Sequence, residues 1–227
     1  MFDAITIFIL LAIFILVYAS HKAVVIDWGA SRYANWLDGL VRLMCRHVHH
    51  LPPTVIPLPE SGPAIVVANH VSGLDPFLLI AASKRPLRFL IAREEYEKPV
   101  LKWLFRMSGC IPVDRSTKPG KALRQALRAL NEGEVIAIFP HGKIHLDTDP
   151  PRKLKAGFAY LASRTQANIY PVRIDGVALE GSVALAPFVP SNVLLTIAPA
   201  LHCEIDQLKV CVNDVSAIIE RPQNSES

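Results

Sequence analysis

The chain has 227 residues, of which 51% are hydrophobic and 19% charged, and its net charge is +4 with the histidines neutral. This length allows one sizeable buried core with a small appended element. The mean hydropathy of +0.31 is high for a soluble domain and indicates a membrane partner. The modest positive charge suits an anionic lipid surface. Because no basic run is interleaved with aromatic residues, we expect no nucleic-acid partner.

The chain begins with an uncharged apolar segment. Between Ala4 and Ala19 only Thr6 and the hydroxyl of Tyr18 interrupt it. At a rise of about 1.5 Å per residue such a segment forms a helix of roughly 24 Å, the short end of a membrane span. We therefore expect residues 1–22 to form a membrane-anchoring helix, either single-pass or monotopic. A cleaved signal peptide is the alternative, although Asp3 stands where such a peptide carries basic residues.

Charge and cysteine content indicate which side of the membrane the rest of the chain occupies. Basic residues follow the apolar segment, namely Lys22, Arg32, Arg42 and Arg46. The positive-inside rule then places the main domain in the cytoplasm. The four cysteines lack Cys-x2-Cys spacing and lie in apolar surroundings, which is typical of reduced cytosolic thiols without a disulfide framework or a zinc site. They are Cys45, Cys110, Cys203 and Cys211.

Residues 23–60 are predicted to form an amphipathic helix and a proline-rich linker. Trp36, Leu40 and Met44 recur at helical spacing. A basic helix of this kind either lies in the lipid headgroup layer or packs on the domain that follows. The prolines between 52 and 59 exclude a helix there. We expect the main domain over 61–221 and a disordered tail over 222–227.

Short apolar runs alternate with helical patterns from residue 65 onward. The predicted strands are 65–68, 88–92, 108–115, 134–139, 169–174 and 192–198, and the predicted helices are 76–83, 99–107, 118–131, 155–165 and 206–221. Alternation with short connections predicts an α/β fold with a largely parallel central sheet flanked by helices.

The first of these strands ends in a histidine, and an aspartate follows five residues later. His70 and Asp75 form an H-x4-D box, in which Asp75 is also expected to cap a helix that begins at Pro76. A carboxylate within hydrogen-bond reach fixes the tautomer of an imidazole and stabilises the imidazolium that forms when the ring takes a proton. The pair therefore predicts a general base at the edge of a sheet, although Asp-Pro is equally a good helix start without chemistry.

Four blocks in order resemble the PlsC-type glycerolipid acyltransferases, whose members include 1-acyl-glycerol-3-phosphate acyltransferases. The blocks are residues 69–75 (Asn-His-Val-Ser-Gly-Leu-Asp), 109–115 (Gly-Cys-Ile-Pro-Val-Asp-Arg), 138–142 (Ile-Phe-Pro-His-Gly) and 169–172 (Ile-Tyr-Pro-Val). The resemblance implies an O-acyltransferase of phospholipid biosynthesis. It would move a fatty acyl group from acyl-CoA or acyl-ACP, as co-substrate, to a hydroxyl of a lysolipid acceptor at the membrane lipid bilayer, with no cofactor and no metal.

The resemblance also assigns roles to single residues. His70 becomes the base for the acceptor hydroxyl, Asp75 its partner, and Arg115 the contact to the acceptor phosphate. Direct attack on a thioester needs only a positioned base, so no protein nucleophile is required. Ser72 and Cys110 are the alternatives as covalent nucleophiles. Backbone donors in the turn after residue 68, or in residues 140–142, are expected to hold the oxyanion.

The third block departs from the family pattern. Members usually read Phe-Pro-Glu-Gly-Thr-Arg-Ser, and this chain reads Phe-Pro-His-Gly-Lys-Ile-His over 139–145. Gly142 keeps the turn, and Lys143 is expected to replace the missing guanidinium as a substrate-binding charge. Three alternatives stay open: an acceptor without a phosphomonoester, a catalytically idle lipid-binding protein, and a lipid or thioester hydrolase. A metal on His141 and His145 is disfavoured, because the glycine and prolines around them predict a loop.

Overall fold

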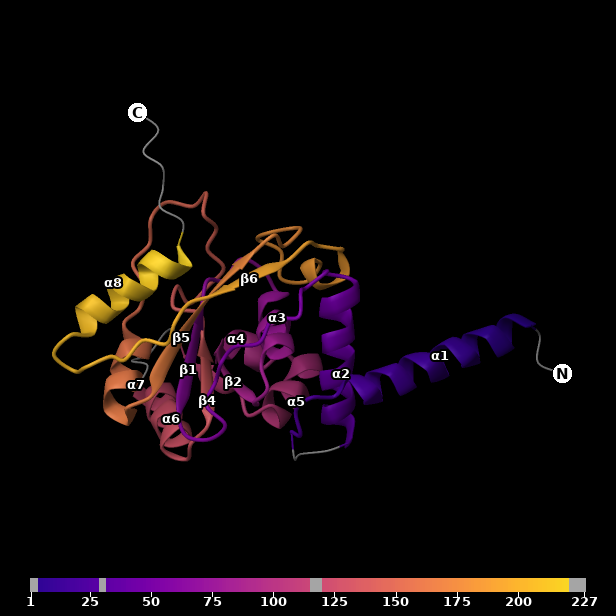
Figure 1. Ribbon diagram of the computed structural model, residues 1–227, viewed down its shortest axis with the longest axis horizontal. Helices are drawn as coiled ribbons and strands as arrows, with labels where there is room; N and C mark the ends of the chain where they lie inside the picture. Colours follow the sequence, from indigo (N-terminus) through magenta and orange to yellow (C-terminus); the bar gives the residue numbers. More distant parts are fainter. Residues whose placement is uncertain (1–3, 29–31, 115–119, 221–227) are drawn as a thin grey trace.

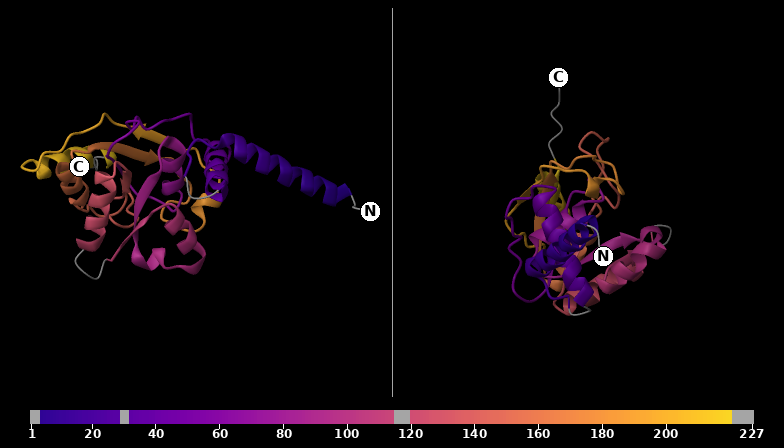
Figure 2. Two further views of the ribbon diagram at one scale, coloured as in Figure 1. Left: turned by 90° about the horizontal axis from the view of Figure 1, so that it is seen from below. Right: turned by 90° about the vertical axis from the view of Figure 1, so that its right-hand side faces the viewer.

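The computed structural model describes residues 4–28, 32–114 and 120–220, shown in Figures 1 and 2. Within these residues the strands form one sheet in the order β3-β2-β4-β1-β5-β6. Their bounds are β1 Ala64–Ala68, β2 Leu87–Ala92, β3 Ile111–Val113, β4 Val135–Ile138, β5 Asn168–Asp175 and β6 Leu194–Ile197. Every neighbouring pair is parallel except β5 and β6, which are antiparallel. The predicted α/β fold with a largely parallel sheet is confirmed.

Helices cover both faces of the sheet (Figure 1). α2 (Arg32–His47) and α3 (Asp75–Ala82) pack on one face, and α6 (Gly120–Asn131), α7 (Gly157–Thr165) and α8 (Leu208–Ile219) pack on the other. Alternate side chains of β1 explain this, because Ala64, Val66 and Ala68 join the first cluster while Ile65 and Val67 join the second. The central strand is thus buried on both sides, as its unbroken apolar run predicts.

Sequence periodicity located each strand of the sheet but missed the two shortest helices. Helix α5 (Pro99–Met107) has the predicted bounds, whereas α4 (Arg93–Tyr96) and the 3-10 helix η1 (Ala186–Phe188) were not predicted. The prediction that Asp75 caps a helix from Pro76 is wrong. Helix α3 begins at Asp75, its N-cap is Leu74, and that cap makes no side-chain hydrogen bond. The Asp75 carboxylate turns back toward the preceding turn instead.

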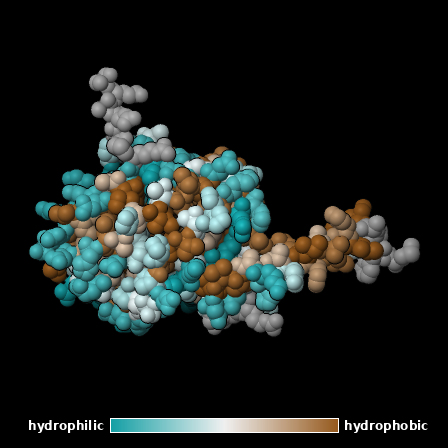
Figure 3. Space-filling view, in the orientation of Figure 1, coloured by the Kyte–Doolittle hydropathy of each residue, from teal (hydrophilic) through white to brown (hydrophobic). Residues whose placement is uncertain are grey.

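Helix α1 (Ala4–Ala23) projects away from the folded body (Figures 1 and 2). Its apolar side chains are largely exposed, and Figure 3 shows them as a brown arm beside a body of mixed colour. Of the described helices, this one is long and apolar enough to cross a membrane, over Ile5–Ala23. Its base packs closely on α2, where a Cβ on Gly39 would lie 1.8 Å from the carbonyl oxygen of Ser20.

Helix α2 packs on the domain, which is one of the two alternatives that its amphipathic pattern left open. Its Asp38 is buried and accepts a hydrogen bond from Arg42 Nε at 2.8 Å. The same guanidinium donates to the carbonyl oxygens of Ala81 and Ser83, at the end of α3. Arg42 is therefore paired inside the protein, and the positive-inside argument depends on the other basic residues.

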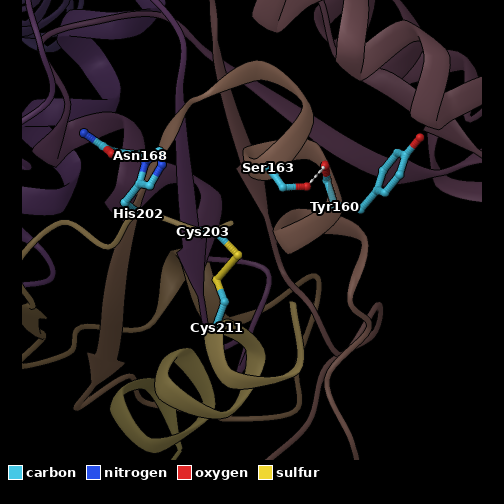
Figure 4. The surroundings of a disulfide bond; sticks show 6 residues. All are labelled: Tyr160, Ser163, Asn168, His202, Cys203 and Cys211. Atoms are coloured by element: carbon cyan, nitrogen blue, oxygen red, sulfur yellow. Dashed lines mark hydrogen bonds between the residues drawn. A yellow bond between two sulfur atoms is a disulfide. The ribbon is translucent and has the colours of Figure 1, made fainter. Parts of the chain in front are cut away.

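The prediction that all four cysteines are reduced thiols is wrong for two of them. Cys203 and Cys211 form a disulfide that joins the segment after β6 to helix α8 (Figure 4). Cys45 and Cys110 are free and buried, and burial raises the pKa of the Cys45 thiol to about 12. Two cysteines eight residues apart have no sequence signature of their own, which is why the spacing did not reveal the pair. Cysteine content consequently does not support a cytosolic location.

Candidate active site

The site begins at the carboxyl end of the central strand β1. Asn69 follows the strand directly and is 4% exposed. Its side-chain amide donates to the carbonyl oxygen of Ile174 at 2.8 Å, and its oxygen accepts the amide hydrogen of Ile174 at 2.7 Å. This two-way bond fastens the end of β1 to β5. The turn that carries His70 therefore starts from a rigid position.

His70 and Asp75 face each other across the turn as predicted. His70 Nδ1 lies 2.7 Å from Asp75 Oδ2, and the carboxylate is fully buried while the imidazole is 20% exposed. The same Oδ2 accepts the amide hydrogens of Val71 at 2.6 Å and Ser72 at 2.9 Å. Oδ1 accepts the hydroxyl of Ser72 at 2.7 Å. Four hydrogen bonds compensate the desolvation of this buried charge and hold it in a single orientation.

This geometry defines the tautomer of the imidazole. A carboxylate can only accept, so His70 Nδ1 carries the hydrogen, and in the neutral ring Nε2 keeps the lone pair. Phe139, from the third block, stacks on the imidazole with ring centroids 4.2 Å apart. The ring is thus held from one face by Phe139 and at Nδ1 by Asp75. Nε2 is left as the proton acceptor, which is the arrangement a general base requires.

Four of the backbone donors that the sequence suggested for an oxyanion are already hydrogen-bonded. The amides of Val71 and Ser72 bind Asp75, and the amide of Gly73 donates to the carbonyl oxygen of Ser182 at 3.0 Å. The amide of Gly142 donates to the carbonyl oxygen of Phe139 at 2.9 Å. These four donors are satisfied inside the protein, so any stabilisation of an oxyanion has to come from other groups.

Neither alternative nucleophile is placed for attack. Ser72 is fully buried, and its hydroxyl both donates to Asp75 and accepts the amide of Leu74 at 3.1 Å. Burial raises the pKa of the Cys110 thiol, although a hydrogen bond with Ser108 opposes this shift. A buried thiol with a raised pKa is a weak nucleophile. Neither Ser72 nor Cys110 therefore has the surroundings of a nucleophile.

The third block forms a loop beside the His70–Asp75 pair, called the dyad from here on. The amide of His145 donates to the carbonyl oxygen of His70 at 2.8 Å, which brings the loop against the turn. Gly142 has φ of +74°, a left-handed conformation that favours glycine. Lys143 follows it and is exposed. Two of the predicted substrate-binding residues thus lie in a loop bonded to His70, and the third, Arg115, lies outside the described residues.

His141 occupies the position where family members carry glutamate. Its side chain is 1% exposed, stacks on His145, and places Nε2 2.9 Å from Glu220 Oε1. Burial lowers the pKa of His141, and the hydrogen bond to Glu220 opposes that shift. A carboxylate from outside the block, Glu220 just beyond the end of α8, therefore pairs with the histidine at this position.

Sequence reasoning missed the residues that support the loop from a distance. Glu220 is one, and Arg173 is another: it donates to Asp147 at 2.6 Å, to Asp175 at 3.0 Å and to the carbonyl oxygen of Ile219 at 2.7 Å. Hydrogen bonds to these carboxylates raise the pKa of Arg173 despite its burial. No local motif marks such partners. A cavity of about 430 Å³ lies between the loop and α8, and His70 is not among its lining residues.

Comparison with known proteins agrees with this architecture. The model of the Acyltransferase family matches residues 42–175. An N-acylphosphatidylethanolamine synthase of Arabidopsis thaliana is 33% identical over 117 residues, which are 47% of this chain and 41% of that protein. A probable 1-acyl-sn-glycerol-3-phosphate acyltransferase of Mycoplasma genitalium is 35% identical over 121 residues, 50% of this chain and 44% of that protein. These matches span less than half the length of each relative.

A solved structure shares the fold. The 1-acyl-sn-glycerophosphate acyltransferase PlsC from Thermotoga maritima has a TM-score of 0.61 and 22% identity, over 80% of this chain and 77% of that chain. The resemblance inferred from four sequence blocks is thus matched by the sheet, by the turn that carries the dyad, and by a family model that covers more than half of the residues. The chain belongs to the Acyltransferase family.

Proposed function

We propose that this chain is an O-acyltransferase that moves a fatty acyl group from an acyl thioester, acyl-CoA or acyl-ACP, to a hydroxyl of a lysophospholipid resembling 1-acyl-glycerol-3-phosphate. One observation carries the proposal, namely the 2.7 Å contact between His70 and a fully buried Asp75 carboxylate. The names of several relatives, which describe 1-acyl-sn-glycerol-3-phosphate acyltransferases, support the substrate class.

In the proposed reaction His70 Nε2 removes the proton from the acceptor hydroxyl as its oxygen attacks the thioester carbonyl. Asp75 stabilises the imidazolium that results. The tetrahedral intermediate then collapses, the carbon–sulfur bond breaks, and the imidazolium returns its proton to the departing thiolate. An ester and a free thiol leave, and His70 is neutral again. The chemistry needs no metal and no cofactor.

The acceptor headgroup is proposed to bind at the loop beside the dyad. Gly142 allows the close turn, Lys143 presents an ammonium, and Arg115 would add a guanidinium that matches phosphate oxygens bidentately. Helix α1 would hold the protein on the bilayer that contains the acceptor. Lys22 and Arg46 favour the cytoplasmic face for the domain, whereas the Cys203–Cys211 disulfide does not.

The central test is turnover of labelled acyl thioester with a panel of lysophospholipids. His70→Ala is expected to abolish ester formation in folded protein, because the base is lost. His202→Ala is the matched control, since that histidine is exposed and contacts Asn168 on a separate part of the surface (Figure 4). Unchanged turnover in His70→Ala would refute the proposal, as would product formation without any added or endogenous lysolipid, which indicates hydrolysis.

The headgroup role of Lys143 is tested separately. Lys143→Ala is expected to raise the Michaelis constant for phosphorylated acceptors and to leave kcat nearly unchanged, because the charge binds and does not react. Lys209→Ala on α8 is the control, since Lys209 is exposed outside the loop. An unaltered Michaelis constant for every phosphorylated lysolipid would show that Lys143 does not bind the headgroup.

A second candidate is acyl transfer to an acceptor without a phosphomonoester. Ile144 stands where family members carry the phosphate-binding arginine, and a relative is named for the synthesis of N-acylphosphatidylethanolamine. Including phosphatidylethanolamine and neutral lysolipids in the acceptor panel separates the two candidates. If no thioester is consumed with any of these acceptors, the result favours the remaining alternative, a lipid-binding protein in which the dyad does not catalyse acyl transfer.

A further inference from the structure

The segment between β5 and β6 presents apolar side chains to solvent. Glu180 is the only charged residue between Gly176 and Pro190. Phe188 is 79% exposed, Leu185 61%, Val183 59% and Leu179 47%. We call residues 179–188 the apolar loop. A group of exposed large apolar side chains on one loop marks a surface that contacts a partner or a membrane.

The apolar loop is held in place, so its side chains do not simply fold inward. Ala186 is fully buried in the core beneath it, and Pro187 offers its carbonyl oxygen to His49 Nε2 at 3.1 Å. The amide of Leu185 donates to the hydroxyl of Ser182 at 3.1 Å. The exposed residues therefore form a fixed platform above a packed base.

The loop lies at the end of the molecule from which α1 projects. Its contact with His49 places it just beyond the C-terminal end of α2, the helix on which α1 packs. Both views agree, because η1 stands beside α2 on the side where α1 leaves the body (Figures 1 and 2). A largely exposed apolar helix of the length of α1 is stable in a bilayer and not in water. A bilayer that received α1 would therefore face the apolar loop as well.

The loop is also bonded to the catalytic turn. The amide of Gly181 donates to the carbonyl oxygen of Val71 at 2.7 Å, and the amide of Gly73 donates to the carbonyl oxygen of Ser182 at 3.0 Å. A Cβ on Gly73 would lie 1.9 Å from the carbonyl oxygen of Val183, so the two backbones touch. A surface that contacts the apolar loop therefore lies close to the turn that carries His70.

From these observations we infer that the apolar loop is a second membrane contact, which inserts Leu185 and Phe188 into the outer part of the bilayer and seats the His70 turn at the lipid surface. The inference rests on the membrane attachment in the proposed function and not on its chemistry. It explains why an acyltransferase would need more than an anchor: α1 alone fixes the distance to the bilayer, whereas a second contact fixes the orientation of the site.

The test uses a fluorophore placed on the loop of the full chain in vesicles. Phe188→Cys and Leu185→Cys are each labelled with an environment-sensitive maleimide dye, which reacts selectively because Cys45 and Cys110 are buried and the other two cysteines are bonded. Val210→Cys is the matched control, since Val210 is an apolar residue, 54% exposed, on α8 at the opposite end of the body (Figure 1).

The vesicles contain phosphatidylcholine and phosphatidylglycerol, with brominated acyl chains on part of the phosphatidylcholine. Bromine quenches only dye that reaches the acyl region, so several-fold stronger quenching at 188 and 185 than at 210 is expected. Equal quenching at all three positions would overturn the inference. A blue-shifted dye that bromine does not quench would also overturn it, because the loop would then be covered by protein, either a second copy or another chain. Quenching and blue shift are both measured without turnover. A result that overturns the membrane contact therefore does not affect the acyl-transfer proposal.

Discussion

Removing the hydroxyl of Ser72 separates a positioning role from a nucleophilic one. Ser72→Ala deprives the buried Asp75 Oδ1 of a donor at 2.7 Å and leaves the amide of Leu74 without its acceptor at 3.1 Å. A buried hydrogen bond to a charged group contributes about 1.5–3 kcal/mol, and an unsatisfied buried amide costs about 1–3 kcal/mol. Partial relaxation brings the expected loss of stability to about 2–4 kcal/mol, which is about 4–16 °C in the melting temperature of a domain of this size.

The same variant is expected to keep measurable turnover. His70 binds Asp75 through Oδ2, and so do the amides of Val71 and Ser72, so the dyad survives on that oxygen. Greater freedom of the carboxylate should lower kcat by about 10- to 100-fold, equivalent to about 1.4–2.7 kcal/mol in the activation barrier. His70→Ala should show no turnover under the same conditions.

Ser83→Ala is the matched control. Its hydroxyl is also buried and also donates to one group and accepts from another, but both partners belong to the backbone of Arg85. It should lower the melting temperature and leave kcat unchanged. The reasoning is refuted if folded Ser72→Ala is as inactive as His70→Ala, because the dyad would then not survive on Oδ2 alone. It is also refuted if the melting temperature does not fall.

Three further predictions follow from other parts of the structure. Gly73→Ala should lower the melting temperature and abolish turnover, because its Cβ would lie 1.9 Å from a backbone oxygen. Gly157→Ala is the control and should change neither, because the space around its Cβ is open. Equal melting temperatures of the two variants would contradict the prediction. Burial lowers the pKa of His141, so the unfolded chain binds the proton more readily. Stability should therefore fall as the pH drops below about 6.5, and a denaturation series should show a weaker fall in His141→Gln. Thiol titration of denatured, unreduced protein should count two thiols, and four would exclude the Cys203–Cys211 disulfide.

The alternation of strands and helices was predictable because it depends on local periodicity. The apolar run 64–68 is buried on both faces, and such a run is typical of a central parallel strand. The order of strands was not predictable in the same way. It depends on which strands pair across the sheet, such as β1 between β4 and β5, and these pairs are separated by more than sixty residues. Local periodicity does not indicate which distant strands are neighbours in the sheet.

The dyad was predictable for a similar reason. His70 and Asp75 are five residues apart on one turn, so local geometry alone brings them together. The partners of the third block were not predictable, because Glu220 reaches His141 from 79 residues away. The prediction for Asp75 was wrong because a capping rule considers only the helix that follows. In the structure the carboxylate instead accepts hydrogen bonds from the amides of Val71 and Ser72 and from the imidazole of His70, which precede it.

The position of Glu220 bears on how far a substrate can be inferred from relatives. The family pattern covers residues 42–175, and Glu220 lies beyond it. Yet this carboxylate holds the buried His141 of the loop beside the dyad, and the C-terminal helix that leads to it is tied by the Cys203–Cys211 disulfide to the segment after β6. The shape of the proposed acceptor site therefore depends on a part of the chain that the family pattern does not describe. Shared blocks support the chemistry proposed for His70, whereas the choice of headgroup depends on residues particular to this chain.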